Sequence, residues 1–243
     1  KLAFERFATS KIDESSALIG IPTLGFRGEA LPSIASVAQV NLVSRPPDQE
    51  SGVNIALRYG DIRDTSSAGV PPGTAFTVRN LFANVPARLR FMASASAELS
   101  RISTVLSAYA LLRPSVAFKL ISNDSQRFAT PGNGSIPDAS AAIQGAEIAS
   151  SLLAVKSIPS GTGQSSFGVE GFASTPAGSR GNRNYITIGV NGRWIQSRRL
   201  SFAIEQAYHG FMKERRFPIA VICLNAPHGD VDVNVHPAKT KVR

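Results

Sequence analysis

The stretch Gly25-Phe26-Arg27-Gly28-Glu29-Ala30-Leu31 organises the interpretation of the whole chain. Its two glycines permit positive φ angles and a close approach of the backbone to a ligand. Pro32 fits the helix start that follows, because proline is tolerated in a first turn. The stretch therefore predicts a glycine loop that opens a helix. Apolar side chains recur at the spacing of one helix face, at Leu31, Ile34, Ala35 and Ala38.

A glycine loop before a helix can bind phosphate, because the first helical N–H groups and the positive end of the helix dipole point at the anion. The sequence is not a Walker A loop, since no Lys-Ser or Lys-Thr follows Gly28. It does not fit the pattern G-x-G-x-x-G either. From the residues alone, a phosphate-binding loop and a tight turn before a core helix both remain open.

The complete heptapeptide resembles the signature of the MutL family of DNA mismatch-repair ATPases. That family belongs to the superfamily of gyrase, heat-shock chaperone, histidine kinase and MutL (GHKL) ATPases. Three further blocks in the same order support the resemblance: Arg6–Ile12, Gly73–Arg88 and Asp232–Lys239. The resemblance covers nearly the whole chain, although residues 122–183 contain no recognised block.

The resemblance implies a nucleotide site. Residues 9–31 would form a lid over ATP, and Thr74 would hydrogen-bond near the adenine. Lys239 would reach the γ-phosphate, where a cation stabilises the charge that develops in phosphoryl transfer; on its residues alone, Lys239 reads as a solvated lysine. The implied ATP-binding residues are Thr9, Ser10, Lys11, Gly25, Phe26, Arg27, Gly28, Glu29, Ala30, Leu31 and Thr74.

The sequence also departs from the family pattern. The family's Glu general base, its magnesium-binding Asn and its Asp-x-Gly adenine motif lie upstream of the Arg6–Ile12 block and are not in this sequence. ATP and Mg²⁺ are the implied cofactors, with the magnesium ligand expected before residue 1. We therefore expect no ATP hydrolysis by this stretch alone. The histidines, at 209, 228 and 236, are scattered, so no metal site is expected within the chain.

Composition favours a globular protein with an anionic partner. The net charge is +9, from 26 Lys and Arg against 17 Asp and Glu, which suits a nucleic acid or nucleotide. No apolar run approaches the ~20 residues that span a bilayer, and no signal peptide is visible. The single Cys223 excludes an internal disulfide framework. We expect the bacterial cytoplasm, or the nucleus if the source is eukaryotic.

A basic cluster occupies residues 180–216, which contain eight Lys and Arg against two Glu. Such a cluster suits the phosphate backbone of a nucleic acid, whose contacts are salt-sensitive and independent of sequence. A solvated face is the alternative interpretation. The DNA-binding candidates are Arg193, Arg198 and Arg199, and Arg199 aligns with an arginine known in the family as a DNA contact.

Hydrophobic periodicity predicts an α+β fold. Helices and strands mix without strict βαβ alternation, so we expect two α/β layers in each domain. Residues 1–10 read as the end of a helix, and Asn191-Gly192 as a hairpin turn. Period-2 patterns predict strands near 40–42, 53–59, 76–78, 116–120, 167–173, 185–190, 218–224 and 231–235, and helices are expected over 86–91, 96–112, 139–153 and 198–213.

Residues 122–140 are rich in Asn, Asp, Ser, Gly and Pro and are the candidate domain boundary. Residues 1–133 would then form the C-terminal part of a GHKL-type ATPase domain with its lid. Residues 134–243 would form a smaller transducer domain like domain 2 of ribosomal protein S5. For this second domain, the resemblance implies a left-handed βαβ crossover.

The function implied by the resemblance is DNA mismatch repair. An ATPase of this kind couples mismatch recognition to downstream repair factors through ATP-driven dimerisation and DNA binding. The implied partners are DNA, a second MutL-type subunit in a homodimer or heterodimer, a MutS-type recognition protein and a nuclease or helicase, with no membrane. Two alternatives are a non-catalytic DNA-binding scaffold and a gyrase B-like topoisomerase ATPase. The heptapeptide and the Asn234–Lys239 block argue against the topoisomerase.

Overall fold

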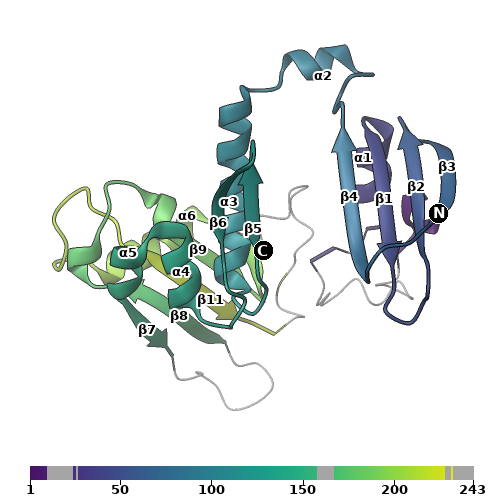
Figure 1. Ribbon diagram of the computed structural model, residues 1–243. Helices are drawn as coiled ribbons and strands as arrows, with labels where there is room; N and C mark the ends of the chain where they lie inside the picture. Colours follow the sequence, from purple (N-terminus) through teal and green to yellow (C-terminus); the bar gives the residue numbers. More distant parts are fainter. Residues whose placement is uncertain (10–23, 26, 158–166, 228–230, 232–243) are drawn as a thin grey trace. The chain divides into compact units, whose positions relative to one another are not determined.

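The computed structural model describes residues 1–9, 24–25, 27–157, 167–227 and 231. The described chain forms two compact units (Figure 1). Described residues up to Ser94 make up the first unit, and those from Ala95 onward make up the second. Among the described residues, no helix is both long and apolar enough to cross a membrane.

The first unit is built on an antiparallel sheet in the order β3-β2-β1-β4. Its strands are β1 (Gln39–Arg45), β2 (Gly52–Arg58), β3 (Asp61–Ala68) and β4 (Gly73–Arg79). The helices of this unit are η1 (Leu2–Phe4), a single 3₁₀ turn, α1 (Ala30–Ser36) and α2 (Pro86–Arg90).

The helix α1 packs on one face of this sheet (Figure 1). Ala35 and Ala38 are 2% and 0% exposed, which confirms the helix face expected from their spacing. Phe4 of η1 stacks on Phe76 of β4, with ring centroids 6.5 Å apart, and closes the same core. The core residues contributed by the sheet are Val40, Ile55 and Leu57.

The second unit contains a five-stranded mixed sheet in the order β10-β9-β11-β8-β7, in which only β9 and β11 run parallel. These strands are β7 (Leu152–Lys156), β8 (Gly168–Ser174), β9 (Ile186–Val190), β10 (Arg193–Ile195) and β11 (Ala220–Asn225). A separate hairpin joins β5 (Lys119–Ser122) to β6 (Ser125–Ala129). The helices are α3 (Ala95–Leu112), α4 (Ile136–Gln144), α5 (Ala146–Ser150) and α6 (Arg198–Ala207), with short 3₁₀ turns η3 (Pro176–Gly178) and η4 (Arg183–Tyr185).

The sheet of the second unit is packed against α3 and α4. Leu111 and Leu112 of α3, Ala139 of α4 and Val221 of β11 are buried together. Cys223 lies half-buried at the edge of this cluster, and burial raises the pKa of its thiol. The hairpin turn at Asn191-Gly192 is confirmed, since β9 and β10 pair directly across it.

Several expected elements differ in extent. The expected helix 139–153 is instead α4, α5 and the start of β7, because Gly145 adopts φ +99° and interrupts the helix. The helix expected to 213 ends at Ala207, and only the η1 turn is helical within residues 1–9. The expected strand 231–235 lies outside the described residues except for position 231.

The candidate boundary region 122–140 contains β6 and the first turns of α4. The two compact units divide at a different place, between Ser94 and Ala95. The assignment of residues 1–133 and 134–243 to two domain types therefore remains a prediction, as does the handedness of the connection from β9 to β11.

Gly171 provides a test of the packing of the second sheet. It adopts φ +144° in β8, and a Cβ atom there would overlap the carbonyl oxygen of Val221. We expect Gly171→Ala to lower the free energy of unfolding by about 1–3 kcal/mol, through strain and overpacking. Urea denaturation would measure the change. The control is Gly168→Ala in the same strand, where the nearest atom is 3.7 Å away and the backbone is unstrained; equal losses in both variants would contradict this prediction.

Candidate nucleotide-lid and nucleic-acid sites

The lid region is described in part. Thr9, Gly25 and residues 27–31 are described, whereas Ser10, Lys11, Phe26 and Lys239 lie outside the described residues. Thr9, Gly25 and Arg27 each make interactions within the chain. The structure therefore gives the geometry of the lid only near α1.

Gly28 joins two of the sequence blocks. It adopts φ +62°, and a Cβ atom there would overlap the carbonyl oxygen of Ala8 and lie 2.8 Å from the carbonyl carbon of that residue. Both the backbone angle and the close approach therefore require glycine. The blocks Arg6–Ile12 and Gly25–Leu31, which are separate in the sequence, meet at this contact.

The helix α1 starts directly after this contact. Glu29 is its N-cap residue and makes no capping hydrogen bond with its side chain. The carbonyl oxygen of Glu29 accepts the first helical bond, from the N–H of Ser33 at 3.0 Å. Ala30 and Leu31 then form the first turn, as the sequence predicts.

The third block holds the other end of α1. The N–H of Phe82 donates to the carbonyl oxygen of Val37 at 2.7 Å. The side-chain amide of Asn84 donates to the carbonyl oxygen of Ser36 at 2.9 Å. These bonds satisfy carbonyl groups that a helix end leaves without partners. Three blocks of the family signature therefore converge on one short helix.

Thr74, the candidate adenine contact, lies on β4 and is exposed. Its hydroxyl shares a hydrogen bond of 2.8 Å with the hydroxyl of Ser44, which is its partner across β1 and β4. A hydroxyl can donate one hydrogen bond and accept two, so Thr74 keeps capacity for a further contact.

Half of the basic cluster at 180–216 has a structural role. Arg183 makes a bidentate ion pair with Glu205 of α6, at 2.5 and 2.9 Å, and lies 4.8 Å from the Phe217 ring centroid. The ion pair raises the pKa of Arg183. Arg216 donates from two guanidinium nitrogens to Ser179. Arg180 pairs more loosely with a glutamate of α5 at 3.8 Å.

Arg193 does not lie on the surface. Its side chain is 4% exposed within β10, and this burial lowers the pKa of its guanidinium. A phosphate backbone could not reach this position without rearrangement of the sheet. Of the three DNA-binding candidates, only Arg198 and Arg199 are exposed.

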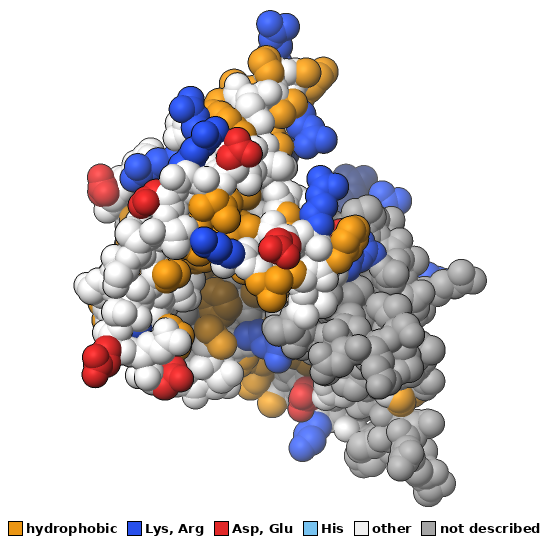
Figure 2. All heavy atoms as spheres, turned by 90° about the vertical axis from the view of Figure 1, so that its right-hand side faces the viewer, with side chains coloured by type: hydrophobic (Ala, Val, Ile, Leu, Met, Phe, Trp, Pro, Cys, Tyr) orange, Lys and Arg blue, Asp and Glu red, His pale blue; other side chains and the backbone are white. Residues whose placement is uncertain are grey.

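Arg198 and Arg199 form the first turn of α6, which Ser197 caps by accepting a hydrogen bond from the N–H of Leu200. Positive charge at a helix N-terminus opposes the helix dipole and costs stability. Lys213 and Arg215 are also exposed. On the face shown in Figure 2, Lys and Arg side chains are more frequent than Asp and Glu side chains.

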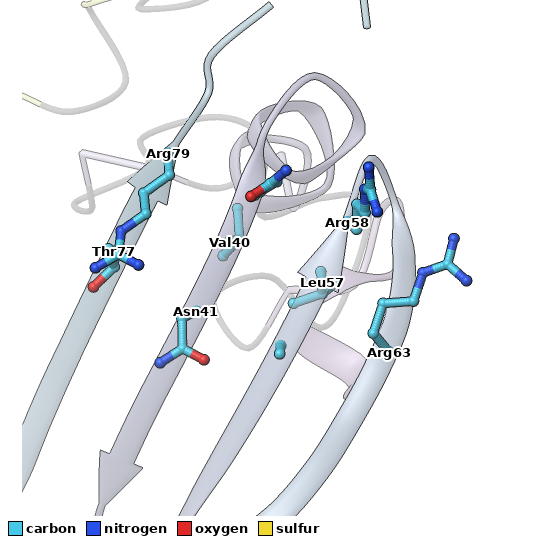
Figure 3. A pocket seen from close by; sticks show the side chains of 9 residues that line it. Val40, Asn41, Leu57, Arg58, Arg63, Thr77 and Arg79 are labelled. Atoms are coloured by element: carbon cyan, nitrogen blue, oxygen red, sulfur yellow. The ribbon is translucent and has the colours of Figure 1, made fainter. Parts of the chain in front are cut away.

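The sequence interpretation missed one site. A hollow of about 350 Å³ lies on the first sheet, lined by side chains from all four strands (Figure 3). Arg58, Arg63 and Arg79 contribute to its lining. Asp61–Ala68 was not expected to be a strand, so the sequence gave no reason to group these arginines. Among the described residues, no group of three or more His, Cys, Asp or Glu could hold a metal ion.

Comparison with known proteins agrees with these features. The family model described as "DNA mismatch repair protein, C-terminal domain" matches residues 140–243. The MutL protein of Symbiobacterium thermophilum is 42% identical over all 243 residues, and the chain covers 38% of it. The MutL protein of Desulforudis audaxviator is 43% identical over the same length, and the chain covers 42% of it. The chain belongs to the MutL family.

This membership covers part of a longer kind of protein, since the chain spans about two-fifths of the length of these MutL relatives. The fold agrees with solved structures. The N-terminal domain of a DNA repair protein matches with a TM-score of 0.80 and 22% identity, over 95% of this chain and 76% of that chain. The Aquifex aeolicus MutL ATPase domain complexed with ADP matches with a TM-score of 0.65 and 24% identity, over 82% and 72%.

These matches confirm the expected α+β fold of the GHKL type. They also decide between two of the open alternatives, because the family is MutL and not a gyrase B-like topoisomerase.

Proposed function

We propose that this chain is the lid-bearing and DNA-binding part of the ATPase region of a MutL-type mismatch-repair protein. The observation that carries the proposal is the 42% identity to a MutL protein across the whole chain, lid block and C-terminal block included. The whole protein would bind and hydrolyse ATP and couple mismatch recognition to downstream repair through dimerisation. Its partners would be DNA, a second MutL-type subunit, a MutS-type recognition protein and a nuclease or helicase, in the bacterial cytoplasm.

The lid residues fit a nucleotide. Gly28 fixes a turn with positive φ beside Ala8, and residues 9–11 would continue from that point toward the triphosphate. Thr74 keeps hydrogen-bonding capacity for a base. Mg²⁺ would be held by residues that precede this stretch in the family, and with ATP it would supply the phosphoryl group and part of the charge stabilisation.

Catalysis would need the upstream general base, so this stretch alone would not hydrolyse ATP. Within the chain, Lys239 would contact the γ-phosphate. A fixed cation there stabilises the charge that develops on the transferred group.

DNA binding would fall to the exposed end of α6. Arg198 and Arg199 lie where the helix dipole disfavours cations, which is consistent with a functional reason for keeping them. Lys213 and Arg215 would extend the same basic surface. Arg180, Arg183 and Arg216 would support this surface by ordering the loops around it.

The lid assignment is tested with Gly28→Val in a longer protein that contains the upstream residues. We expect weaker ATP binding, because a β-branched residue resists positive φ and would displace Ala8. Calorimetric titration with ATP would measure the affinity. Gly69→Val is the control, since nothing lies within 4 Å of a Cβ atom there; unchanged ATP affinity in Gly28→Val would remove this loop from the nucleotide site.

The role of Lys239 is tested by Lys239→Ala in the same longer protein. We expect ATP turnover to fall more than ATP affinity, because one lost contact in the transition state costs about 3–4 kcal/mol. Steady-state kinetics and a nucleotide titration separate the two effects, and Lys156→Ala on β7 is the control. Normal turnover would show that Lys239 is a solvated lysine, and absence of turnover in the unmodified protein would favour a non-catalytic scaffold.

The DNA surface is tested with Arg199→Glu. We expect it to weaken binding to every duplex sequence alike and by more than Arg199→Ala, because phosphate contacts carry no base information and the glutamate adds repulsion. The logarithm of affinity should fall linearly with the logarithm of salt, by about 0.9 per phosphate contact. Fluorescence anisotropy at two salt concentrations measures both quantities. Lys156→Glu makes the same charge change on β7, and an equal loss in that variant would reduce the effect to net charge.

A further inference from the structure

The hollow on the first sheet lies on the face opposite α1. Successive residues of a strand point to opposite faces, and Val40 and Leu57 belong to the core under α1. Their neighbours therefore point the other way. Val40 and Leu57 also border the hollow, but both are 3% exposed and offer little apolar surface. The complete lining consists of Gln39, Val40, Asn41, Ala56, Leu57, Arg58, Arg63, Thr77 and Arg79, and contains no acidic residue.

The strand register brings two of the arginines to the same level. Gln39 pairs with Arg58 on one side and with Arg79 on the other, so an amide side chain stands between two guanidinium side chains. Two strand spacings, roughly 10 Å, separate the backbones of the two arginines. One register step away, Asn41 stands opposite Thr77. The floor of the hollow therefore offers amide and hydroxyl groups between the arginines.

A β-bulge adds the third arginine. Ala56 pairs with Asp64 and Leu57 pairs with Ile62, so Arg63 is the extra residue of β3. A bulge of this kind re-aims a side chain and often lies beside a functional site. Here the bulge places Arg63 in the lining of the same hollow (Figure 3).

These positive charges are little compensated by the described residues. Arg63 pairs with Asp61 at 3.0 Å, but the two side chains are 61% and 72% exposed, and an exposed pair contributes little. Arg58 lies 5.8 Å from the ring centroid of Tyr59. Within the described part of the chain, Arg79 has no hydrogen bond or ion pair, and its side chain runs back along β4 toward Thr77 (Figure 3).

The nearest other acid is engaged elsewhere. Asp64 accepts a hydrogen bond from the hydroxyl of Ser66 at 3.3 Å and does not line the hollow. Three guanidinium groups and neutral polar side chains therefore face the same space, a combination that recognises phosphate by forked hydrogen bonds.

We propose that this hollow binds backbone phosphates of DNA, as a second contact surface separate from α6. The inference rests on the DNA-binding part of the proposed function. An open hollow without an aromatic lining residue suits a backbone better than a nucleotide, whose base needs a stacking partner or an enclosed pocket. An acidic protein segment is disfavoured because interfaces between proteins need an apolar core, and the hollow exposes polar side chains.

The test uses the whole chain and a fluorescent duplex of about 25 base pairs, a length that exceeds one typical protein footprint. The variants are Arg79→Gln, Arg58→Gln and their combination, with Arg127→Gln as control, because Arg127 is exposed on β6 of the other unit. We expect each hollow variant to lose about five- to tenfold in affinity near 0.1 M salt and about 0.9 of the salt slope, with the control unchanged. Thermal melting of each variant confirms that the fold is intact.

Two further probes separate the sources of negative charge. ATP and a poly-glutamate peptide are titrated against the same variants, and the side-chain N–H signals of the hollow arginines are followed by NMR with duplex DNA. Shifts of the Arg58, Arg63 and Arg79 signals with DNA support the proposal. Losses confined to ATP or to poly-glutamate would overturn it.

The result also distinguishes this proposal from the proposed function. If Arg199→Glu weakens DNA binding and the hollow variants match Arg127→Gln, the hollow proposal is wrong and the α6 surface stands. If the unmodified chain binds no duplex DNA, both DNA surfaces are wrong. If only the hollow variants lose affinity, DNA binding lies on the first sheet and the α6 assignment is wrong.

Discussion

The first unit depends on the burial of α1 against its sheet. The helix has seven residues, which is too short to be stable alone, so its order comes from packing. Ala35 within the helix and Ala38 just after it allow the backbone to approach the sheet closely. Gly28 and Ala8 fix its start, and hydrogen bonds from Phe82 and Asn84 fix its end. A change at any of these contacts would disturb the lid and the core together.

Charge in this chain divides into two kinds. Arg183 and Arg216 are bound by partners that order the loops of the second unit, and Arg193 is buried in its sheet. Arg198 and Arg199 instead stand exposed at a helix end where the dipole opposes them. A count of charges over 180–216 cannot separate these groups, because the separation depends on which arginines find acids or carbonyl groups after folding.

The sequence predicted the elements with strong periodicity and the family motifs, and it failed where pairing rather than burial decides the structure. The α1 helix and the strands β1, β2 and β9 follow the apolar spacing of their residues. The strand β3 is an edge strand whose residues are exposed up to Ser67, so no alternation marks it. The burial of Arg193 and the grouping of Arg58 with Arg79 depend on register, which one sequence does not specify.

The two units each keep a cationic surface that the described chain does not neutralise, α6 in one and the hollow of the first sheet in the other. Unpaired like charges cost stability in a folded protein, and they recur here on unrelated elements, a helix end and a sheet face. A polyanion that reaches both surfaces gains from each contact, because the second contact is made within an existing complex. Duplex DNA carries one charge per about 1.7 Å of its length, so it can offer phosphates to both units in many relative arrangements. Two modest surfaces on separate units can therefore hold DNA without base recognition, which suits a protein that acts at mismatches in any sequence context.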